Sequence, residues 1–196
     1  LATTLAVMRL FELGRIDLEQ RLPSILPFFA DTDKSDVTIA QLLSHTGGLP
    51  DHRPYYFDLA GWPDKKRKAR LRTRLVQEPL VSPPGERVLY SDLGFMILEW
   101  AVEAASGRRL DHFVSEEFYA PLGVADSLFF IPLDRPPPIH AYAATERCAW
   151  RQRLLVAQVH DENAYAVGGI AGHAGLFGTA QPFTAFLQNS WGRITR

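Results

Sequence analysis

The sequence feature that most restricts the fold is an apolar helical pattern over 93–105. Ser91 or Asp92 can cap its start, and Ser106-Gly107 can end it. Helical periodicity also covers four other stretches: 1–13, 37–43, 64–77 and 111–119. Strand-like patterns are limited to 128–131 and, more weakly, 153–159. We therefore expect an α+β or mostly α-helical protein, in which any sheet is supplied largely from elsewhere.

The segments between these patterns carry turn and loop signals. Ser35 or Asp36 is a plausible N-cap for the helix over 37–43. Three further expectations are an extended piece at 87–90, a special backbone conformation in the glycine-rich segment 168–178, and a last helix from Thr179 or Gln181 to Trp191.

Composition narrows the class of protein. The chain has 196 residues, of which 46% are hydrophobic and 22% charged, and its formal net charge is −1. These values are typical of a globular domain and create no global field toward nucleic acid or an anionic membrane. The single cysteine, Cys148, excludes a disulfide framework and a cysteine-based zinc site. No apolar run of about 18 residues predicts a membrane span.

Both ends of the sequence suggest a fragment. Leu1 opens directly on a helical pattern, with neither an initiator methionine nor an N-cap, and Arg196 follows closely on a helix-like stretch. We expect this to be part of a longer chain, and its localisation, periplasmic or secreted against cytoplasmic, stays open.

A basic run at 65–74 has two interpretations. It could be a patch for nucleic acid or an acidic partner, or a solvated helix face balanced by acids elsewhere. No aromatic residues interleave with the basic ones. We favour the solvated face and expect no nucleic-acid partner.

The sequence offers no local metal or nucleophile motif. The histidines that have acids nearby lack a short chelating spacing, so a metal site would need long-range assembly, and we expect neither metal nor cofactor. No serine lies in Gly-x-Ser-x-Gly, and none is followed three residues later by lysine. Cys148 has no helix N-terminus beside it and is expected to be structural.

Tyr90-Ser91-Asp92 follows a Pro-Pro-Gly turn and precedes the apolar helix. This order places a phenol and a carboxylate together at a helix N-terminus, where the dipole favours their anionic forms. Such a tyrosine can transfer protons if a cation lowers its pKa. The alternative is a core aromatic followed by a plain N-cap.

Several segments resemble motifs of one family, in the same order along the chain. They are 37–50, which resembles "LLSHTSGLP"; 84–95, which carries Tyr90; 106–110 with 121–124, which resemble "SGKPL…PLGM"; and 172–180, which resembles "GGLFSTA". The family is that of serine β-lactamase-related proteins, which includes class C β-lactamases, D-alanyl-D-alanine carboxypeptidases and esterases. The resemblance implies a β-lactamase/transpeptidase-like α+β fold. Residues 1–196 would be the central, mainly helical portion of one domain, without its N- and C-terminal sheet elements.

The resemblance also implies a mechanism through an acyl-serine, in which a Ser-x-x-Lys serine attacks a carbonyl and water releases the product. Tyr90 matches the family's proton-transferring tyrosine. Asp92 replaces an asparagine and, when ionised, accepts hydrogen bonds but cannot donate them, which favours an acyl substrate other than a β-lactam or peptide. By the family's layout, Ser-x-x-Lys should end just before Leu1 and the third motif should follow Arg196.

Tyr90 and Asp92 are therefore our catalytic candidates. Four residues are candidates for substrate contact: Ser91, His160, Asn163 and His173. Hydrogen bonds that only fix loops are the alternative for His160 and Asn163. His173-Ala174-Gly175 also matches the family's His-x-Gly string, although its context is that of "GGLFSTA".

The function we expect is that of a serine hydrolase acting on a small ester, amide or peptide, with D-amino-acid peptides and β-lactams among the candidates. The 196-residue chain itself is expected to be inactive. The alternative is a non-catalytic binding or scaffold module of the same fold.

Overall fold

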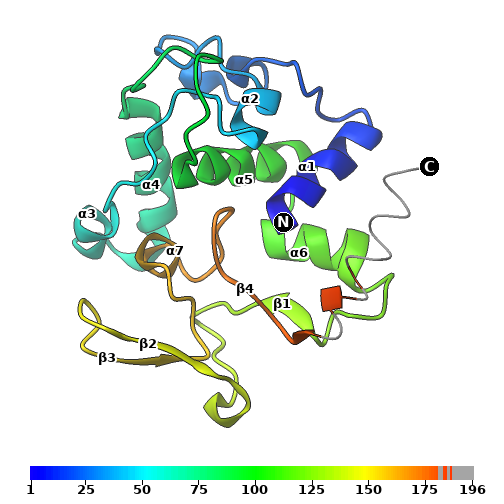
Figure 1. Ribbon diagram of the computed structural model, residues 1–196, viewed down its shortest axis with the longest axis vertical. Coiled ribbons are helices and arrows are strands. Elements are labelled where there is room, and N and C mark those ends of the chain that lie inside the picture. The colour runs from blue at the N-terminus through cyan, green and yellow to red at the C-terminus, as the bar shows by residue number, and fades with distance from the viewer. Residues whose placement is uncertain (181–182, 185, 187–196) are drawn as a thin grey trace.

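The structure is a computed structural model that describes residues 1–180, 183, 184 and 186 (Figure 1). The α-helices are α1 (Ala2–Glu12), α2 (Ile39–Leu43), α3 (Tyr56–Ala60), α4 (Asp64–Gln77), α5 (Asp92–Ser106), α6 (Leu110–Val114) and α7 (Glu162–Ala166). Short 3-10 helices are η1 (Leu22–Ser24), η2 (Pro27–Phe29) and η4 (Ile139–Ala141), and η3 (Ser115–Tyr119) is a single π-helical turn. The strands are β1 (Leu128–Phe130), β2 (Ala144–Cys148), β3 (Arg153–Val156) and β4 (Leu176–Gly178).

Helix α5 is the centre of the helical part, with α1, α2, α4 and α6 packed around it (Figure 1). Its apolar side chains are buried because the helix is hydrophobic over most of its circumference. Ser91 is the N-cap, and its Oγ accepts a hydrogen bond from Gly94 N–H at 3.3 Å. Gly107 ends the helix with φ +70°, a conformation that glycine adopts without strain. Both boundary predictions for this helix are confirmed within one residue.

The strands form two separate antiparallel pairs, β1 with β4 and β2 with β3, which lie below the helical part in Figure 1. The weak strand pattern at 153–159 is realised only as β3. Its partner β2 was not predicted, because polar residues dominate that strand and leave little alternation.

Other local expectations need correction. The N-cap of α2 is Thr38, not Ser35 or Asp36, because Thr38 and Gln41 form a reciprocal capping box. The piece 87–90 joins no strand. The helix expected over 111–119 is divided into α6 and η3. The last helix, expected to reach Trp191, lies largely outside the described residues.

The basic run lies on α4, whose bounds agree with the predicted 64–77. Asp58 Oδ2 lies 2.9 Å from the Nε atoms of both Arg70 and Arg74. Glu103 lies 2.8 Å from Lys68 and 2.5 Å from Arg72. Neighbouring acids thus balance many of these cations, as the interpretation of a solvated face predicts. Across the described part of the chain, every helix is too short or too polar to span a bilayer.

A buried charged residue joins α5 to the glycine-rich segment. Glu99, which is 3% exposed, lies 2.5 Å from Lys68 Nζ, and its Oε2 accepts from Gly172 N–H at 3.0 Å. On the other side, Thr3 Oγ1 donates to Gly172 O at 2.6 Å. A Cβ at Gly172 would lie 2.1 Å from Phe95 O, so only glycine fits this approach. Helices α1 and α5 therefore fix the start of the segment that carries His173.

Candidate active site

The segment 81–92, which carries Tyr90 and Asp92, is held by the segment 45–51. Backbone hydrogen bonds of 2.7–2.9 Å join the two regions: Val81 N–H to Gly48 O, Gly85 N–H to Thr46 O, Leu89 N–H to His45 O, and Asp92 N–H to Asp51 O. Gly48 has φ +77°, and a Cβ there would lie 2.2 Å from Ser82 O. The first two motifs of the sequence are thus one structural unit.

Tyr90 presents its side chain to solvent, with 67% of the residue exposed. Its ring lies over the imidazole of His45, with ring centroids 4.4 Å apart. His45 Nδ1 accepts a hydrogen bond from Ser91 N–H at 3.0 Å, which requires an unprotonated nitrogen there. Burial lowers the pKa of His45, although the charge of Asp92 opposes this. The imidazole is therefore neutral near pH 7, and Tyr90 packs against it.

Ser91 and Asp92 begin α5. Ser91 is buried, and its hydroxyl donates to Pro50 O at 2.6 Å while it caps the helix, so its hydrogen-bonding capacity is largely used within the protein. Asp92 Oδ2 lies 3.6 Å from His52 Nδ1. Tyr90 and Asp92 thus flank the N-cap of α5, and each lies against a histidine, His45 and His52 respectively.

A second polar pair joins Asp161 to His173. His173 Nε2 lies 2.8 Å from Asp161 Oδ1, and the His173 side chain is 2% exposed. His173 Nδ1 is buried without a hydrogen-bond partner among the described residues. Burial alone would raise the pKa of Asp161, but the hydrogen bond and charge of His173, with a contribution from His52, hold it below its usual value.

His160 and Asn163 differ in exposure and contacts. The His160 side chain is 56% exposed, and its Nε2 lies 3.1 Å from Glu146 Oε1. Together with Asp161 it lines a cavity of about 800 Å³ between β1, β4 and the segment 158–161. Asn163 is fully buried. Its Oδ1 accepts from Tyr56 N–H at 2.9 Å and its Nδ2 donates to Arg53 O at 2.8 Å. Contact of either residue with substrate stays a prediction.

We expect Asn163→Ala to lower the free energy of unfolding by about 2 kcal/mol, because it leaves the partly buried Tyr56 N–H and Arg53 C=O without partners. Denaturant unfolding measures this. Gln77→Ala, which removes an exposed amide at the end of α4, is the matched control and should change stability by less than about 0.5 kcal/mol. Equal stability of the two variants would contradict the structural role of Asn163.

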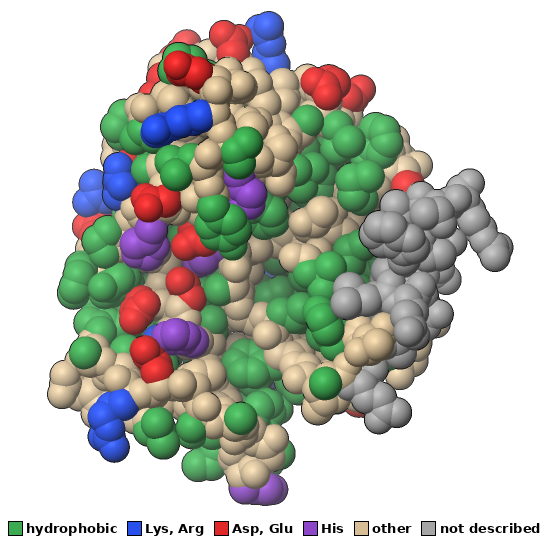
Figure 2. All heavy atoms as spheres, viewed as in Figure 1, with side chains coloured by type: hydrophobic (Ala, Val, Ile, Leu, Met, Phe, Trp, Pro, Cys, Tyr) green, Lys and Arg blue, Asp and Glu red, His purple; other side chains and the backbone are tan. Residues whose placement is uncertain are grey.

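On the face shown in Figure 2, histidine and acidic side chains gather on one side, next to a surface rich in hydrophobic side chains. The sequence analysis did not select His45, His52 or Asp161 as site residues. His45 lies within the first family motif, which was the available signal, whereas nothing local marks the approach of His52 to Asp92. A group that could hold a metal ion, Glu146 with Cys148 and Glu162, lies beside His160.

Comparisons with known proteins identify the family of the chain. The family model described as Beta-lactamase matches residues 1–195. The chain is 32% identical to the "Putative D-alanyl-D-alanine carboxypeptidase" of Escherichia coli K12, over 95% of this chain and 47% of the relative. It is also 32% identical to the "N-acetylmuramyl-L-alanine amidase" of Bacillus subtilis 168, over 95% of this chain and 46% of the relative. The chain thus spans about half the length of these curated relatives.

The fold is shared with solved structures. A penicillin-binding protein from Bacillus halodurans matches with a TM-score of 0.68 and 24% identity, over 95% of this chain and 56% of that chain. A β-lactamase/D-alanine carboxypeptidase from Yersinia pestis matches with a TM-score of 0.64 and 20% identity, over 95% and 50%. These likenesses confirm the predicted α+β, β-lactamase/transpeptidase-like fold. Together with the family match over nearly its whole length, they show that this chain belongs to the β-lactamase family.

Proposed function

We propose that this chain supplies the tyrosine side of the active site of an acyl-serine hydrolase that cleaves a small ester or amide. The observation that carries the proposal is the exposed phenol of Tyr90, held at the N-terminus of α5 on the face of His45. A rigid scaffold under an exposed proton-transfer group is what acid–base catalysis requires.

In the proposed reaction, a serine hydroxyl attacks the substrate carbonyl, and its proton passes through Tyr90 to the leaving oxygen or nitrogen. Water then cleaves the acyl-serine ester and restores the serine. The nucleophile comes from outside this sequence, because no serine here is followed three residues later by lysine. That the matched relatives are about twice as long supports this division.

The substrate class follows from Asp92 and from the relatives. An ionised Asp92 accepts hydrogen bonds but cannot donate one to a substrate amide, which favours an acyl substrate other than a β-lactam or peptide. The relatives' names include a carboxypeptidase and an amidase, and both describe cleavage of an amide bond. Ester and amide substrates are therefore both proposed, with peptides containing D-amino acids as candidates to be tested.

An activity-based probe tests the proposal. A fluorophosphonate is added to the 196-residue chain and to the chain extended by the residues encoded upstream. We expect labelling of the extended protein only, at a serine followed three residues later by lysine. Labelling of a serine within residues 1–196 would overturn the assignment. Absence of labelling in both proteins would instead support the alternative function, a non-catalytic binding or scaffold module of the same fold.

A further inference from the structure

We propose that Glu146, Cys148 and Glu162 form a binding site for one divalent ion of the zinc class, with His160 as the fourth ligand. The proposal does not rest on the proposed hydrolase function, and it gives His160 the role of a metal ligand in place of the substrate contact expected from the sequence. Two of the four ligands lie on the β2–β3 hairpin and two lie at or just before the start of α7. The ligands come from two separate segments, so their spacing along the sequence does not indicate a metal site.

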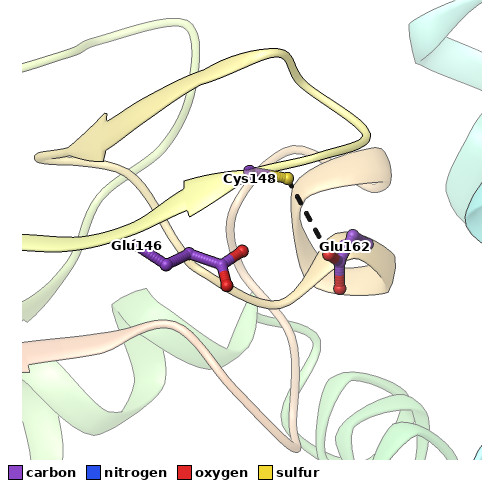
Figure 3. A group of neighbouring side chains, drawn as sticks. All are labelled: Glu146, Cys148 and Glu162. Atoms are coloured by element: carbon purple, nitrogen blue, oxygen red, sulfur yellow. Dashed lines mark hydrogen bonds between the residues drawn. The ribbon is translucent and has the colours of Figure 1, made fainter.

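The geometry of three ligands carries the proposal. One ligand atom from each of Glu146, Cys148 and Glu162 lies within 4.8 Å of the other two. Cys148 Sγ and Glu162 Oε1 are 3.9 Å apart. Zinc–oxygen and zinc–sulfur bonds of about 2.0 and 2.3 Å place tetrahedral ligand atoms about 3.3–3.5 Å apart, so rotations of the side chains that close the group by at most about 1.5 Å complete the site. Figure 3 shows the thiol and both carboxylates turned toward the space between β2 and α7.

His160 completes a set of four ligands. Its Nε2 lies 3.1 Å from Glu146 Oε1, so the imidazole already contacts one of the other three side chains. Because 56% of this side chain is exposed, it can turn toward the ion without disturbing the core. The spacing repeats itself: Glu146 precedes Cys148 by two residues, as His160 precedes Glu162. A nitrogen, a sulfur and two oxygens are a donor set that zinc accepts in tetrahedral geometry.

Charge supports an ion with a thiolate ligand. Arg151 directs two N–H donors at Cys148 Sγ, its backbone N–H at 3.4 Å and its Nε at 3.3 Å. Such donors stabilise a metal-bound thiolate from the surrounding shell. Two carboxylates and one thiolate carry three negative charges, which a divalent ion and the Arg151 guanidinium together neutralise. On binding, the Cys148 thiol releases its proton to solvent.

The ligand types also select the ion. A thiolate and an imidazole favour zinc over magnesium or calcium, which take oxygen ligands. The sequence analysis excluded a cysteine-based zinc site because there is one cysteine. The proposal revises that expectation, since the other donors come from glutamate and histidine. A bound ion would tie the hairpin to α7 and thereby stabilise the neighbouring Asp161, which holds His173.

The test uses the purified protein, free of any affinity tag, with Zn²⁺ or Co²⁺ alone as the probe. We expect one Zn²⁺ per chain by calorimetry, and a thiolate-to-cobalt charge-transfer band in the near ultraviolet with Co²⁺. Cys148→Ser should abolish that band and weaken Zn²⁺ binding by about 100-fold. Glu146→Gln and His160→Ala should each weaken it by about tenfold or more. Two exposed controls, His140→Ala and Glu19→Gln, should bind as the parent protein does.

Two results would contradict the proposed metal site. No Zn²⁺ binding at micromolar concentration, or binding of unchanged affinity in both Cys148→Ser and Glu146→Gln, would overturn the site. Glu146 is partly exposed, so its variant decides the question even if the Cys148 variant fails to fold. Circular dichroism of each variant without metal shows which ones are folded.

Discussion

Tyr90→Phe is expected to lower the acylation rate by about 10²–10⁴-fold in the extended protein that carries the nucleophile, since this is the usual contribution of one positioned acid–base group. The change removes only the hydroxyl. The ring keeps its tilted contact with His45, 4.4 Å between centroids, so the scaffold of the site is kept. Stopped-flow acylation with a chromogenic ester measures the effect.

The control for this experiment is Tyr165→Phe, which removes a hydroxyl from the hairpin side of the molecule, where Tyr165 Oη lies 3.4 Å from Arg153 Nη2. It should leave the acylation rate within about twofold of the parent. A Tyr90→Phe protein that acylates at the parent rate would remove Tyr90 from the proposed proton path. A variant that has a raised KM and a lower folding stability, but the acylation rate of the parent, would also count against the assigned role.

Lys68→Met is expected to lower the free energy of unfolding by about 3 kcal/mol at pH 7, because it leaves the buried Glu99 carboxylate without its cation. Glu103 stands nearby and repels the same carboxylate. Already in the parent protein, burial raises the pKa of Glu99, although Lys68 opposes it. Removal of the Lys68 charge raises the pKa of Glu99 further. Denaturant unfolding at several pH values measures this.

The pH dependence of the free energy of unfolding identifies Glu99 as the cause of the expected destabilisation. A buried acid whose pKa is raised in the folded state binds more protons there than in the unfolded chain, so stability falls as pH rises from the ordinary glutamate pKa, 4.5, through the raised value. The deficit of Lys68→Met relative to the parent should therefore shrink as the pH falls toward 4.5. Lys65→Met, on the exposed face of α4, should show almost no deficit at either pH. A deficit that does not change with pH would place its origin in packing rather than in Glu99.

Sequence reasoning succeeded where the signals are local. The predicted bounds of α4 agree with the structure because hydrogen bonds within a helix join residues four apart, so sequence periodicity records them directly. The cap of α5 could be narrowed to Ser91 or Asp92 for the same reason, since capping joins residues two or three positions apart, and the structure has Ser91. The strand β2 was missed because its pairing with β3 depends on a partner rather than on its own polar sequence.

The sequence by itself determined the helical character of the chain, the family resemblance and the placement of Tyr90 at the start of a buried helix. Only the tertiary structure decided what surrounds that tyrosine. His45 contacts its ring from 45 positions away, Asp161 pairs with His173 in the glycine-rich segment, and Glu99 binds Gly172 over a separation of 73 residues. The physical reason is that these partners are chosen by packing of distant elements, which brings charges and rings together only after the chain has closed around α5.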